Sequence, residues 1–168
     1  MAAAAGQQAP APQQAPKPAA PAATEQKPAD KPVESNWVTQ CGAKTRAGAL
    51  DCSVQQTIIK TDTGQLVAQV SVRVPADTRS PVMMIQLPLG LFLPAGVELQ
   101  IDQNKTIELP LQTCDASGCF AGTPLTADML GQFQKGKSLR IGFKNLTQSK
   151  IDLSMPLPGF ATAYEGIR

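Results

Sequence analysis

The 168-residue sequence contains no histidine, and this absence narrows the chemistry that the protein can perform. Histidine is the side chain most often used as a general base, a proton shuttle and a metal ligand near neutral pH. Without it, Ser-His-Asp and Cys-His catalysis are excluded, and a Ser-Lys pair is the main nucleophilic arrangement left. The sequence also lacks a Gly-x-Ser-x-Gly motif, a calcium-binding run of aspartates and a local pair of catalytic carboxylates. We therefore expect no enzymatic activity, no metal and no cofactor.

The sequence also has few aromatic residues, at 4% of the total, and a small net charge of +2. A protein that binds nucleic acid usually clusters Lys and Arg on one face, and the sequence has no such cluster. Long hydrophobic runs are missing too, because polar, proline and glycine residues interrupt the most apolar segment, residues 82–97. A bilayer-spanning helix needs roughly 20 apolar residues. We expect a soluble monomer with no nucleic-acid partner and no membrane span.

The first 34 residues are made almost wholly of Ala, Pro, Gln and Lys. Such a segment cannot bury enough apolar surface to offset the backbone entropy of folding, so residues 1–34 are predicted to be a disordered tail or tether. An inert leader without a spacer role has the same composition. The opening Met1–Gly6 has neither a basic region nor an apolar core. We hypothesise that its alanines remain beside the cleavage site of a removed signal peptide.

A two-residue hydrophobic period dominates the rest of the chain, residues 35–168. Alternating apolar residues are typical of strands with one face in a core and the other in water. They occupy residues 66–74, 97–101, 107–111, 139–143 and 151–155. Turn-forming residues separate them at 62–64, 102–104 and 145–149. The pattern predicts an all-β fold: a single antiparallel β-sandwich domain.

One segment has a helical pattern instead. Thr126 is a suitable N-cap, Met129 and Phe133 share a face at helical spacing, and Gly136 follows as a stop signal. This predicts one short helix over residues 127–135. We expect its apolar face to cover an open end of the sandwich, since core packing is the commoner use of such a stripe.

The cysteines form two close pairs, Cys41 with Cys52 and Cys114 with Cys119. Four cysteines allow three connectivities, of which local pairing is the simplest, and Gly118 gives the shorter ring the backbone freedom it needs. The spacing of the first pair is too wide for a zinc ribbon, and no Cys-x-x-Cys motif precedes a helix. The cysteines therefore predict two structural disulfides and a periplasmic or secreted location, because cytosolic thiols are kept reduced.

The apolar run over residues 82–97 has two interpretations. Its Pro and Gly residues exclude a single regular strand. Either a central strand passes through the core and then turns, which is the commoner use of such a run, or part of it is exposed for a partner. In the second case we expect the partner-binding residues to be Leu89, Leu91, Phe92 and Leu93.

Five landmarks then appear in one order along the chain. They are Trp37 with Cys41 and Cys52, residues 87–97 (LPLGLFLPAGV), residues 114–121 (CDASGCFA), residues 130–136, and residues 157–163 (LPGFATA). In this order residues 37–164 resemble the invasion-associated locus B family. The resemblance implies a small exported bacterial protein of the envelope or periplasm, almost all β, and a role in the invasion of host cells. It supplies no catalytic residues.

These observations favour a non-enzymatic envelope protein that binds another protein or a cell-surface component through sheet edges and loops. Loops on a rigid β scaffold commonly carry recognition. A lectin-like or small-ligand binding module is the alternative, although Trp37 and Tyr164 are the only Trp and Tyr residues for stacking on a sugar. A histidine-independent enzyme is the third hypothesis.

Overall fold

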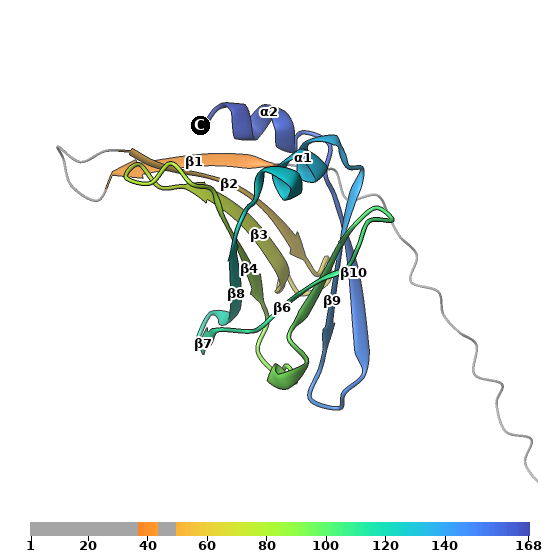
Figure 1. Ribbon diagram of the computed structural model, residues 1–168. Coiled ribbons are helices and arrows are strands. Elements are labelled where there is room, and N and C mark those ends of the chain that lie inside the picture. Colours follow the sequence, from red (N-terminus) through yellow and green to blue (C-terminus); the bar gives the residue numbers. More distant parts are fainter. Residues whose placement is uncertain (1–36, 44–49) are drawn as a thin grey trace, which may run out of the picture. The chain divides into compact units, whose positions relative to one another are not determined.

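The computed structural model describes residues 37–43 and 50–168, which form two antiparallel sheets packed face to face (Figure 1). The predicted tail, residues 1–34, lies outside the described residues and stays a prediction, as does the domain boundary at residue 35. Among the described residues, no helix is long and apolar enough to cross a bilayer.

The first sheet contains six strands, in the spatial order β1 (Val38–Ala43), β2 (Leu50–Ile59), β3 (Leu66–Val74), β4 (Val82–Leu87), β8 (Gly118–Pro124) and β7 (Thr113–Asp115). The second contains four, in the order β10 (Lys150–Pro156), β9 (Ser138–Lys144), β5 (Val97–Ile101) and β6 (Ile107–Leu109). The remaining elements are the short 3₁₀ helix η1 (Leu93–Ala95) and the α-helices α1 (Ala127–Lys135) and α2 (Phe160–Glu165).

The core lies between the sheets and is filled by every second residue of the strands. On β3, Ala68, Val70 and Val72 are fully buried, while Arg73 between the inner positions is exposed. The same alternation places aliphatic side chains of β4, β5 and β9 in the core. The predicted antiparallel sandwich is therefore confirmed. Residues 82–87 form the central strand β4, which agrees with the first interpretation of the apolar run.

The two α-helices lie together at one end of the sandwich (Figure 1). Helix α1 spans the predicted residues, and the Thr126 hydroxyl accepts a hydrogen bond from the Met129 N–H at 3.3 Å. Gly136 ends α1 in an extended rather than a left-handed conformation. A glycine is still required at this position, because a Cβ there would approach the methyl carbons of Ile101 and Leu157 within 2.9 Å.

Helix α2 was not predicted from the sequence, and it brings Phe160 to the centre of an aromatic cluster. Phe160 is fully buried, with its ring centroid 4.9 Å from that of Trp37, 5.3 Å from Phe133 and 5.7 Å from Tyr164. Phe133 comes from α1 and Trp37 precedes β1, so one side chain joins both helices to the first sheet. The cluster closes this end of the core.

Both predicted disulfides are present, Cys41–Cys52 and Cys114–Cys119. Each joins residues that face each other directly across an antiparallel strand pair. The first pair ties β1 to β2 and the second ties β7 to β8, and β1 and β7 are the two edges of the six-stranded sheet. Gly118 has a φ of 145°, and a Cβ there would collide with a backbone carbonyl of β4. The disulfides therefore hold both edges of this sheet to their neighbours.

Replacing Phe160 with Ala should lower the free energy of unfolding by about 3–5 kcal/mol, because the change leaves a cavity between two helices and a sheet. Urea denaturation followed by far-UV circular dichroism measures this change. A loss below about 1 kcal/mol would show that the helices pack on the sheet without the Phe160 ring.

Replacing each cysteine pair with alanine should destabilise the fold to different degrees. Removing the Cys41–Cys52 link should cost about 3 kcal/mol and removing the Cys114–Cys119 link about 2 kcal/mol, since the longer loop loses more entropy when closed. Chemical denaturation of the two double variants under non-reducing conditions gives both values. The reverse order would contradict an origin in loop closure.

Candidate interaction surfaces

The end of the sandwich opposite the helices exposes large apolar side chains. The structure places two of the four predicted partner-binding residues outward, with Leu89 56% and Leu93 49% exposed. Phe92 is half-buried, and Leu91 packs into the core with 6% exposure. The binding role of all four residues stays a prediction.

Leu146, which sequence reasoning missed, belongs to the same surface and is 70% exposed. It lies in the turn between β9 and β10, and its N–H donates to the Gly90 carbonyl at 3.1 Å. The Phe92 N–H likewise donates to the Lys144 carbonyl at 2.9 Å. Backbone hydrogen bonds therefore hold the segment after β4 against this turn.

The turn itself is ordered by its own polar side chains. The Asn145 carboxamide oxygen accepts hydrogen bonds from the Thr147 hydroxyl at 2.7 Å and from the Ser149 N–H at 2.9 Å. These bonds satisfy the turn internally, so the Leu146 side chain is free to point outward on a fixed backbone.

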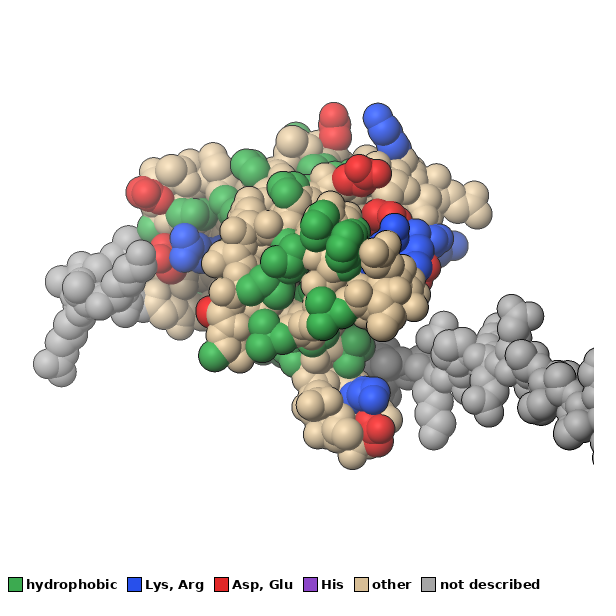
Figure 2. Space-filling view, turned by 90° about the horizontal axis from the view of Figure 1, so that it is seen from below, with side chains coloured by type: hydrophobic (Ala, Val, Ile, Leu, Met, Phe, Trp, Pro, Cys, Tyr) green, Lys and Arg blue, Asp and Glu red, His purple; other side chains and the backbone are tan. Residues whose placement is uncertain are grey.

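A groove of about 410 Å³ continues this surface. Leu93 and Pro94 of η1 form one wall, and Pro110 and Leu111, which follow β6, form the other. We define the apolar end as Leu89, Phe92, Leu93, Pro94, Pro110, Leu111 and Leu146. Figure 2 shows apolar side chains gathered in the middle of this face, with charged side chains towards its margins.

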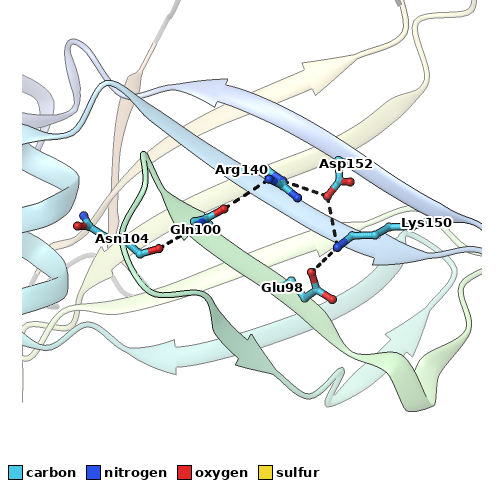
Figure 3. Close-up of polar contacts among 6 residues, drawn as sticks. All are labelled: Glu98, Gln100, Asn104, Arg140, Lys150 and Asp152. Atoms are coloured by element: carbon cyan, nitrogen blue, oxygen red, sulfur yellow. Dashed lines mark hydrogen bonds and ion pairs between the residues drawn. The ribbon is translucent and has the colours of Figure 1, made fainter. Parts of the chain in front are cut away.

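The outer face of the four-stranded sheet is, in contrast, covered by paired charges (Figure 3). Lys150 Nζ lies 2.6 Å from a carboxylate oxygen of Glu98, and Arg140 Nε lies 3.2 Å from a carboxylate oxygen of Asp152. The hydrogen bond from Lys150 to Glu98 is the main cause that raises the pKa of Lys150. These pairs are solvent-exposed, so each contributes little to stability.

A glycine leaves room for this network of charged side chains. Gly142 lies between Glu98 and Asp152 in the strand register. A Cβ there would come within 3.0 Å of an Asp152 carboxylate oxygen and within 3.3 Å of a Glu98 carboxylate oxygen. The absence of a side chain at Gly142 therefore gives both carboxylates the space to approach Lys150.

Two carboxylates with lowered pKa values have structural partners. Backbone N–H groups of Lys137 and Ser138 donate to Asp102 and lower its pKa. The Ser117 side chain and backbone do the same for Asp115, inside the shorter disulfide ring. Structural contacts of this kind perturb pKa values without any catalytic role. Neither carboxylate therefore points to catalysis.

The aromatic residues considered for sugar stacking lie at the helical end. Trp37 and Tyr164 both pack with Phe160, and burial raises the pKa of the Tyr164 hydroxyl. Their rings therefore form part of the core closure. Among residues 37–43 and 50–168, no three His, Cys, Asp or Glu side chains are grouped so that they could hold a metal ion.

Together, the fold and these surfaces define a small disulfide-linked β-sandwich with one apolar end and one charged face. A family model described as "Invasion associated locus B (IalB) protein" matches residues 37–168. The chain therefore belongs to the invasion-associated locus B family, as its order of landmarks predicted.

Named relatives agree with this assignment. The chain is 25% identical over 134 residues to invasion protein B homologs of Brucella abortus strains 2308 and 9-941, covering 79% of this chain and 76% of each relative. A crystal structure of invasion associated protein B from Bartonella henselae superposes with a TM-score of 0.67 at 23% identity, covering 78% of this chain and 89% of that one. The latter similarity shows a shared fold.

Replacing Asp102 with Asn should remove part of the pH dependence of stability. The folded-state pKa of Asp102 lies below its unfolded value, so the ionised carboxylate stabilises the fold above about pH 4. This contribution is lost as the pH falls through the folded-state pKa. The urea midpoint should fall less steeply with decreasing pH in the variant than in the natural protein.

Ser138→Ala provides a matched comparison for Asp102→Asn. It removes the Ser138 hydroxyl but keeps the two backbone N–H donors, which are the larger cause of the pKa shift. The variant should retain most of the pH dependence. A profile as flat as that of Asp102→Asn would assign the effect to the hydroxyl instead.

Proposed function

We propose that this family member is an exported, non-enzymatic protein of the bacterial envelope that binds a partner protein through its apolar end. Two disulfides support an extracytoplasmic location, because such bonds persist in oxidising compartments. The relatives are named as invasion proteins, which supports a role at the contact between bacterium and host. Residues 1–34 would serve as the tether that their composition predicts.

The exposure of three leucines on one ordered surface carries this proposal. Leu89 and Leu93 come from the segment after β4 and Leu146 from the β9–β10 turn, and the hydrogen bonds of Leu146 to Gly90 and of Phe92 to Lys144 hold the two together. Monomeric proteins rarely leave contiguous large apolar side chains in water unless the surface takes part in an interaction. Because the supporting backbone is hydrogen-bonded, little ordering entropy would be lost on binding.

The margin of the apolar end favours a protein partner over a lipid surface. Lys144 and Lys150 lie on the side of the charged sheet, but Glu98 is paired with Lys150, and Glu108 lines the groove. An apolar centre with a polar rim of both signs is the common anatomy of a protein interface. Attraction to anionic lipid would call for a rim dominated by Lys and Arg.

The double variant Leu93→Gln/Leu146→Gln should bind the partner at least about tenfold more weakly, because central apolar contacts dominate interface energies. Photo-crosslinking from position 146 in the native envelope identifies the partner. Titration of that purified partner with the natural and variant proteins then gives both affinities.

Leu50→Gln is the matched control, since Leu50 is 63% exposed at the start of β2, outside the apolar end. This variant should bind like the natural protein, and all variants should keep the natural melting temperature. Equal affinity of the double variant and the natural protein would refute the proposed surface.

A further inference from the structure

The outer face of the six-stranded sheet carries fewer charges than that of the four-stranded sheet, and its charged side chains lie towards the margins. Its outward positions alternate with the buried residues of β2, β3, β4 and β8. We define the amide face as the outward positions in the middle of these strands: Ser53, Gln55, Thr57, Gln69, Ser71, Arg73, Val82, Met84, Gln86, Phe120, Gly122 and Pro124. Arg73 is the one charged side chain among these positions, and Asp51 of β2 and Asp115 of the edge strand β7 point outward beside them.

Glutamine carboxamides occupy the middle of this surface and are held by hydrogen bonds. Gln69 Nε2 donates to Gln55 Oε1 at 2.8 Å, and Gln86 Nε2 donates to the Ser117 carbonyl at 2.9 Å. Among the contacts of the described residues, this leaves Oε1 of Gln69 and Gln86 to accept and Nε2 of Gln55 to donate. The face therefore presents fixed, uncharged donors and acceptors.

Apolar side chains lie opposite some of the polar side chains of this face. Gln86 faces Phe120 in the register of β4 and β8, and Ser71 faces Met84 in the register of β3 and β4. Phe120 is half-buried and Met84 is 46% exposed. Side chains directly opposite on neighbouring strands lie about 5 Å apart, so one small group can contact both members of a pair.

We propose that this amide face binds a neutral glycan carrying N-acetyl groups. An acetamido group combines an amide dipole with a methyl group, which matches the Gln86 carboxamide next to Phe120. Sugar hydroxyls pair with the remaining Gln, Ser and Thr groups. A neutral ligand fits the middle of the face around Gln55, Gln69 and Gln86, where a charged one would lose hydration without gaining a counter-charge.

The uncharged middle of the outer face is small compared with a stable protein interface. Four strands at about 4.8 Å spacing and five residues at about 3.3 Å rise give an area of roughly 14 by 13 Å. A stable protein interface buries about 800 Å² on each partner. A surface of this size accommodates a short oligosaccharide.

The test is a titration of the full, ¹⁵N-labelled chain with chitotetraose, which carries N-acetyl groups, and with cellotetraose, which has the same length without them. Chitotetraose should shift the side-chain amide signals of Gln55, Gln69 and Gln86 and the backbone signal of Phe120. Gln69→Ala/Gln86→Ala should weaken this binding about tenfold, because two neutral hydrogen bonds are lost.

Gln100→Ala is the matched control, because Gln100 lies on the outer face of the other sheet (Figure 3). It should leave chitotetraose binding unchanged. The proposal is overturned if cellotetraose binds equally well, if the shifts map elsewhere, if neither sugar binds, or if the amide-face signals instead change with protein concentration, which would indicate a second copy. None of these results depends on the apolar end, so the two proposals fail separately.

Discussion

The burial of every second strand residue between the two sheets is the constraint on which the rest of this structure depends. Val54, Val70, Ile85 and Ile141 are all fully buried, although they come from four different strands. Because the side-chain period of a strand is two, a register slip of one residue would bring outward groups such as Gln69 into the core. The packed interior therefore fixes which side chains reach each outer face, and with them the chemistry that those faces offer.

The two open ends of the sandwich core are covered in different ways. At one end, α1 and α2 cover the core, and Phe160 joins them to the first sheet. At the other end, the segment after β4 and the β9–β10 turn cover it with hydrogen-bonded backbone. That covering buries Leu91 but leaves Leu89 and Leu146 in water. The apolar end is thus a consequence of closing a core with two short segments, which have too few side chains to turn all their apolar surface inward.

Local signals in the sequence were sufficient to predict the strands, the first helix and the pairing of the cysteines. The alternation around Val70, the Thr126 cap and the short cysteine spacings each depend on a few neighbouring residues. Helix α2 was missed because its six residues are too few for a helical period and its packing partners, including Trp37, are distant in sequence. Leu146 was missed for a related reason, since its place beside Gly90 depends on how β9 and β10 pair.

The apolar end and the amide face border each other along one short stretch of chain. Leu111 lines the groove of the apolar end, and the side chain of the next residue, Gln112, donates to the Gly122 carbonyl on the amide face at 3.0 Å. The second disulfide ties β7, which begins one residue after Gln112, to β8, so this border is covalently fixed. A large partner on the apolar end would therefore lie close to a ligand on the amide face, whereas most of the charged face of the other sheet would remain in water. The distribution of charge makes this arrangement consistent, because the paired ions are concentrated on the face that neither proposed ligand covers.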